Sequence, residues 1–155
     1  MALVIEDGTD VDGADSFVTA VQAAASEVSY FGASSITDDD AGEASLRRAW
    51  VYMAALDWKA DTYPLFGGTI PDAVKVAQAV FARAEFQTPN FLSPSQSLSG
   101  RKVLSEVKGI KWDVQSAPAT IEAMRPVVTM GFDLLKPYLA KDLSKTGGTT
   151  FLERA

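Results

Sequence analysis

Hydrophobic residues recur at helical spacing near the start of the chain and predict a first helix. The residues that would share its buried face are Phe17, Val21, Ala24 and Val28. A cap at Asp15 or Ser16 would start this helix near Phe17, and the glycine at position 32 would end it.

A second helical pattern predicts a helix from about Ala41 to Ala60. Its apolar stripe is formed by Leu46, Ala49, Trp50, Met53 and Leu56. The acidic run 38–40 precedes it, where carboxylates complement the positive end of a helix. Tyr63-Pro64 and Gly67-Gly68 then break the pattern into a loop.

Two more helices are predicted by the pattern around prolines. Ile70-Pro71-Asp72 favours a helix start, because proline is tolerated in the first turn and aspartate is favoured there, and Pro89 stops this third helix. A fourth helix should begin at Pro126 after a short turn near 119–124, and Pro137 should kink or end it.

Alternating hydrophobic and charged residues replace the helical spacing between 101 and 115. Val103 and Val107 share one face, Lys108-Gly109 is a turn, and Ile110, Trp112 and Val114 alternate with charged residues. The pattern predicts a β-hairpin. We therefore expect a mainly α fold: a bundle of three to four helices, a protruding hairpin and extended N- and C-terminal arms.

The domain organisation that follows is simple. Residues 1–141 form one helical domain, with the hairpin near 101–115, and residues 142–155 form a flexible C-terminal docking tail rich in Gly, Ser and Thr. The first residues carry no basic segment typical of a signal peptide, and no apolar run approaches the roughly 20 residues that span a bilayer. We expect no membrane partner.

Composition narrows the chemistry further. The 155 residues include no histidine and no cysteine, which removes the usual general base, the thiolate nucleophile and the ordinary zinc site. We expect no enzyme, no catalytic residue and no cofactor. The net charge of -6 opposes general nucleic-acid binding, which depends on positive charge, although a local basic patch stays open.

Other candidate motifs favour structural explanations. The acidic loop 8–13 does not fit a calcium loop, because positions 1 and 12 would be Gly8 and Thr19. The run 38–40 caps a helix more readily than it binds a metal, and Gly67-Gly68 lacks the lysine of a phosphate loop. We expect no metal site, and we expect Trp50 and Trp58 to pack in the core or an interface rather than stack on bases.

One cluster suggests partner or channel contact. Arg101, Lys102, Lys108 and Lys111 form a basic ribbon opposed nearby only by Glu106, and Trp112 lies on the same hairpin. A solvated hairpin face is the simple interpretation; contact with an acidic partner or with passing DNA is the sharper one. In the tail, the remaining candidates are Phe151, Leu152 and Arg154.

Several of these blocks together resemble a family of tailed-phage proteins. The blocks are 4–9, Gly13 to Thr19, Leu46-Arg47-Arg48-Ala49 with Trp58-Lys59, Ile70-Pro71, the basic hairpin 100–114, and Leu134-Leu135-Lys136-Pro137-Tyr138-Leu139. The resemblance covers residues 3 to about 140. The chain is similar to head–tail connector or adaptor proteins, some of whose relatives carry the label DnaT-like single-stranded DNA-binding protein. It departs from that pattern at 60–69, where a Trp-Pro-Arg-like element is expected.

The resemblance implies a structural virion protein of the neck, at the head–tail interface. Such a protein, assembled in the host cytoplasm, would form a ring, commonly of twelve subunits, beneath the portal protein. It would contact stopper or tail proteins, and genomic DNA would pass through its channel without sequence-specific binding. The alternatives are a DnaT-like single-stranded DNA-binding protein and a tail-completion or stopper protein.

Overall fold

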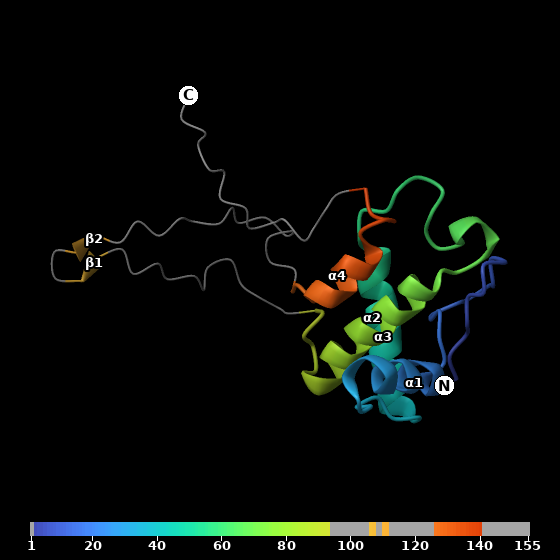
Figure 1. The fold of residues 1–155 in the computed structure, drawn as a ribbon, viewed down its shortest axis with the longest axis horizontal. Coiled ribbons are helices and arrows are strands. Elements are labelled where there is room, and N and C mark those ends of the chain that lie inside the picture. Colours follow the sequence, from blue (N-terminus) through green and yellow to red (C-terminus); the bar gives the residue numbers. More distant parts are fainter. Residues whose placement is uncertain (1, 94–105, 108–109, 112–125, 141–155) are drawn as a thin grey trace.

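The computed structural model describes residues 2–93, 106–107, 110–111 and 126–140, and the chain there is mainly helical (Figure 1). In chain order the elements are α1 (Ala20–Phe31), α2 (Asp40–Ala54), the 3-10 turn η1 (Phe66–Gly68), α3 (Asp72–Gln87), β1 (Glu106–Val107), β2 (Ile110–Lys111) and α4 (Thr129–Leu135). The prediction of a mainly α fold with three to four helices is confirmed.

The third helix forms the centre of this arrangement. It packs against α1, α2 and α4, whereas the described parts of α1 and α4 do not contact each other. Figure 1 shows α1 near the beginning of α2 and α4 toward its other end. Eight residues of α3 are buried: Val74, Ala77, Gln78, Ala79, Val80, Phe81, Ala82 and Glu85. Each large apolar side chain buried here contributes about 1.5–3 kcal/mol.

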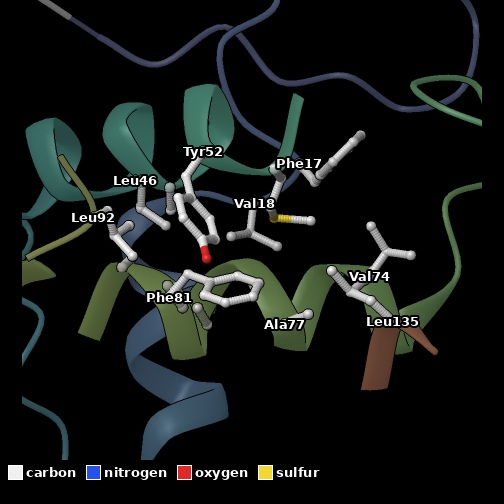
Figure 2. Close-up of a cluster of buried hydrophobic side chains, with 14 of the residues drawn as sticks. Phe17, Val18, Leu46, Tyr52, Val74, Ala77, Phe81, Leu92 and Leu135 are labelled. Atoms are coloured by element: carbon white, nitrogen blue, oxygen red, sulfur yellow. The ribbon is translucent and has the colours of Figure 1, made fainter. Parts of the chain in front are cut away.

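The packing around Phe81 explains how the helices are held together (Figure 2). Its ring meets Tyr52 of α2 at 5.1 Å between ring centroids, and Figure 2 shows these two side chains next to each other. It also meets Phe132 of α4 at 5.5 Å. A Cβ added at Gly131 would lie 2.7 Å from Phe81 Cζ, so only glycine lets α4 approach this closely. The core therefore joins three helices through one aromatic side chain.

The predicted start and buried face of the first helix are wrong. Helix α1 begins at Ala20, and Thr19 caps it in a reciprocal capping box with Gln22. Phe17 and Val18 precede the helix in a bend of the chain and are buried in the core. The Phe17 N–H donates there to the buried Gln78 Oε1 at 2.8 Å.

The helix also presents a different face to the core from the one predicted. Its buried residues are Ala20, Ala23 and Glu27. Val21 and Val28, which the spacing assigned to the core, are 59% and 52% exposed. The hydrophobic stripe of α1 therefore faces outward, and only Phe17 of that predicted set is fully buried.

Helix α2 is shorter than predicted, ending at Ala54 rather than near residue 60. Beyond it, Trp58 Nε1 donates to the Met53 carbonyl at 2.8 Å and satisfies one of the groups that a helix end leaves open. Trp58 also forms an antiparallel bridge with Leu139. It is therefore a packing residue beyond the helix rather than a second tryptophan on it.

The predicted N-terminal arm is also wrong, because this segment is bonded to the rest of the protein. Ile5 pairs with Ser16 in a parallel bridge, and the Val4 N–H donates to Asp15 Oδ1 at 2.8 Å. Gly8 lies against Gly68, where an added Cβ would come within 2.6 Å of the Gly68 carbonyl carbon. The loop between Ile5 and Ser16, which contains Gly8, therefore packs onto η1.

The predicted hairpin is described only in part. Glu106–Val107 and Ile110–Lys111 pair antiparallel, with Glu106 opposite Lys111 and Val107 opposite Ile110. Two residues per strand do not establish the hairpin over 101–115, and its remaining residues lie outside the described part of the chain. The tail 142–155 also lies outside the described part of the chain. Helix α4 begins at Thr129, three residues later than the start predicted at Pro126. It ends at Leu135, before Pro137, as expected.

Candidate interaction surface

Most of the predicted contact residues cannot be placed. Seven of them lie outside the described residues: Arg101, Lys102, Lys108, Trp112, Phe151, Leu152 and Arg154. Lys111 is in β2, where only its backbone pairing is described. Their roles stay predictions, and the candidate surface has to be sought on the helical body, by which we mean residues 2–93 and 126–140.

The helical body is strongly acidic. It carries fifteen carboxylate and six basic side chains, whereas residues 94–125 and 141–155 together carry eight basic and five acidic ones. The net charge of -6 therefore combines an acidic body with slightly basic remaining segments. A polyanion such as DNA would be repelled by the body.

The arginines of the body are already engaged within it. Arg47 Nε pairs with Asp15 at 2.7 Å, and the hydrogen bond to this carboxylate raises the pKa of the guanidinium. Arg48 reaches buried Glu85 at 3.3 Å. Arg83 lies 3.7 Å from Glu27 and places its guanidinium 4.4 Å from the Phe31 ring centroid. These cations stabilise the fold and do not form a phosphate-binding patch.

Three buried glutamates organise loops of the body. Glu6 accepts the N–H groups of Gly8, Asp10 and Val11, all in the turn that follows it. Glu85 accepts those of Asn90 and Leu92 at 2.8 and 2.9 Å, just beyond the end of α3. Buried carboxylates often indicate acid–base chemistry, but donors of the protein itself occupy these oxygens.

Glu27 is the third of these glutamates and controls the orientation of α1. Its carboxylate accepts the Ser35 and Ile36 N–H groups and the Ser34 and Ser35 hydroxyls. Because Glu27 must face inward to reach this loop, the opposite side of α1 faces outward. Sequence reasoning missed all three glutamates, since nothing in their spacing distinguishes a buried carboxylate from a solvated one.

The acidic run 38–40 serves as a helix cap, as expected. Asp39 Oδ1 accepts the N–H groups of Ala41 and Gly42 at 3.0 and 2.9 Å and the Thr37 hydroxyl at 2.7 Å. The hydrogen bond from Gly42 is the main reason why the pKa of Asp39 lies below its usual value. Among the residues that the structure describes, no three acidic side chains gather as metal ligands would.

The aromatic residues of the body form an internal cluster. Six rings meet at centroid distances between 4.5 and 6.2 Å: Phe17, Trp50, Trp58, Tyr63, Phe66 and Tyr138. The prediction that Trp50 and Trp58 pack rather than offer a stacking surface is confirmed for the body. The Tyr63 hydroxyl is buried and has no hydrogen-bond partner within the described part, and its burial raises the tyrosine pKa.

The outward side of α1 differs from the rest of this acidic surface. The one charged residue of α1, Glu27, is buried, and Val21, Ala25 and Val28 are exposed. The Ser26 and Ser29 hydroxyls donate to the Gln22 and Ala25 carbonyls of the same helix at 3.0 Å, so they require no water. This outward side, Val21 to Ser29, is called the α1 face. Surface helices normally carry charges, so this face suits burial against a partner.

The comparisons with known proteins add a family. A family model described as "Putative DnaT-like ssDNA binding protein" matches residues 1–155. The chain belongs to this family. No curated protein and no solved structure matches it significantly.

The family description agrees with one alternative drawn from the sequence, the DnaT-like single-stranded DNA-binding protein, and does not mention a connector. It points to DNA as a partner. None of the described helices has the length and apolar character needed to cross a membrane.

Proposed function

We propose that the protein is a structural assembly subunit, specifically a head-to-tail adaptor that forms a ring beneath the portal in the neck of a tailed-phage virion. The observation that carries the assembly role is the uncharged, apolar α1 face on an otherwise acidic body. The place in the virion rests on the sequence blocks that resemble connector proteins.

Charge supports this role over direct DNA binding. In a ring around a DNA channel, carboxylates of the body lining the channel would keep the genome from adhering while it passes. The basic excess in residues 94–125 and 141–155 would then be available for contacts with acidic neighbours, including the bodies of adjacent subunits. No sequence-specific recognition of DNA is needed.

The tail 142–155 is the element that we propose to dock onto the portal, with Phe151 and Leu152 as its apolar anchor. A segment that becomes ordered on binding can follow an extended surface, although ordering reduces its affinity per unit area. Residues upstream would then hold the ring together.

The test is to mix the full chain with purified portal rings of the same phage and image the product by electron microscopy. We expect an added ring of density on one end of the portal. Truncation before Ser144 should abolish it, while Phe151→Ala combined with Leu152→Ala should weaken it. A full chain that leaves the portal bare at high concentration would refute the proposal.

Single-stranded DNA binding is the second candidate, because the family description favours it. Such binding would have to use the basic side chains outside the helical body. A gel shift at 50 and 200 mM salt tests it: a site that neutralises four phosphates loses about 50-fold in affinity over this range. We expect no shift at either salt concentration; a shift that weakens in this way would favour the DNA-binding function.

A further inference from the structure

We propose that the α1 face is an interface with a second copy of this chain, and that it docks on a different surface of the neighbour, formed by the end of α2 and the segment before α4. The inference deepens the proposed ring and rests on it only for the assembled state, because the contact surfaces themselves come from the helical body.

The α1 face has the properties of a surface that can lose its water at low cost. Val21, Ala24, Ala25 and Val28 stand at intervals of three, four and seven residues, so they lie along one side of the helix. Its two serines are satisfied by backbone carbonyls. Burying it leaves no charge and no serine hydroxyl without a partner, which are the main costs of forming an interface.

A second apolar surface lies elsewhere on the body. Val51 and Val127 are 67% and 57% exposed. Their neighbours Tyr52 and Pro126 are joined by a hydrogen bond of 2.6 Å from the tyrosine hydroxyl to the proline carbonyl, so both valines flank the same junction. Ala54 and Ala55 are also exposed there. We call this the α2–α4 face.

The charge of the helical body supports a second copy of this chain as the partner of the α1 face. Two bodies that each carry fifteen carboxylates and six basic side chains repel one another over most orientations. Copies can approach closely only where the carboxylates are absent, and the α1 face meets that condition.

The size of the α1 face excludes a stable isolated dimer. A helix of 12 residues is about 18 Å long and about 10 Å wide, so one side of it covers a few hundred Å². A stable two-chain interface buries about 800 Å² on each partner. A contact of this size is weak alone and becomes strong when a closed ring repeats it.

Two different faces also define the symmetry. The described parts of α1 and α4 do not touch, and Figure 1 shows them apart, on either side of α3. A contact between unlike faces is heterologous and adds subunits head to tail, whereas α1 packing on α1 would stop at a dimer. The two faces therefore predict a ring or an open chain of copies.

Site-directed cross-linking tests this arrangement, because the chain has no cysteine of its own. Chains with Ala25→Cys are mixed with chains carrying Val51→Cys, and a short bifunctional maleimide is added with and without portal rings. The control replaces the second chain with Ala60→Cys, an exposed position outside both faces. We expect products between positions 25 and 51 at least tenfold above the control on the portal.

The other outcomes are also decisive. Products joining position 25 only to position 25, or a yield equal to the control, would overturn the inference even if rings form on the portal. Conversely, 25-to-51 products with no portal binding would support the interface and refute the adaptor function. In a second arm, Ala25→Glu should lower ring occupancy at least tenfold, whereas the matched Ala60→Glu should leave it unchanged.

Discussion

The buried carboxylate of Glu27 should be a main determinant of both stability and the orientation of α1. Replacing it by alanine removes the acceptor of the Ser35 and Ile36 N–H groups and the acidic partner of Arg83. Ile36 is itself buried, so its donor cannot turn to water without opening the loop. The substitution also leaves space where the carboxylate stood.

The magnitude follows from these losses. Each buried donor left without a partner costs about 1–3 kcal/mol. The lost ion pair adds less than the roughly 3–5 kcal/mol of a fully buried pair, because a quarter of the Arg83 side chain is exposed. We therefore expect Glu27→Ala to lower the free energy of unfolding by about 3–5 kcal/mol, a large part of the 5–15 kcal/mol that a domain typically has.

Urea unfolding followed by tryptophan fluorescence measures this change. The midpoint should fall while the slope with denaturant stays the same. Glu43→Ala is the matched control, since Glu43 pairs with Arg47 at 3.3 Å within α2 with both side chains partly exposed, at 20% and 28%, and should cost less, about 0.5–1 kcal/mol. Equal losses for the two variants would refute the role assigned to Glu27.

Three further predictions concern single contacts. Asp39→Asn should keep the helix cap but remove its titration. Because hydrogen bonds lower the pKa of Asp39, the stability that its charge contributes is present above pH 3.8 and is lost as the pH falls through the lower pKa of the folded protein. The urea midpoints of the two proteins should therefore differ in their pH slope only below about pH 4. Gly131→Ala should destabilise by about 1–3 kcal/mol, because the new methyl group meets the Phe81 ring, whereas Thr129→Ala on the same helix should be nearly neutral in thermal unfolding. Tyr52→Phe should cost about 1 kcal/mol by losing its bond to Pro126, and Tyr63→Phe should be neutral or stabilising, since its hydroxyl has no partner in the described part; the same sign for both would contradict these assignments.

The helices could be predicted because their signals are local. Proline at the start of α3, the acidic cap before α2 and the prolines around α4 act within a few residues. The exact start of α1 could not be predicted, because it depends on Gln78, which is 61 residues from Phe17. Local spacing suggested that Val21 and Val28 face the core, and this distant contact decided otherwise.

The candidate surface was missed for the same reason. Part of the signal was present in the sequence, since Ala20–Phe31 contains one charged residue, Glu27. That Glu27 is buried could not be predicted, because its burial depends on the loop that begins at Ser34, seven residues later. The N-terminal segment was predicted as an extended arm, because its partners are not visible in the local pattern. The structure folds it back on itself through Glu6 and Ser16 and packs Gly8 against Gly68. The predicted contacts at 101–112 and 151–154 remain predictions.

The bridge at the end of the helical body has a mechanical consequence. The Ala140 N–H donates to Asp57 and the Lys59 N–H to Tyr138, at 2.8 and 3.0 Å, so the chain leaves the body through a short antiparallel clamp. Tension applied to the residues that follow would be borne first by these two bonds and then by the aromatic rings of Phe66 and Tyr138 behind them. Pulling on that end would therefore strain the end of the body near Trp58 before it reached α3, leaving the central packing intact while the clamp holds.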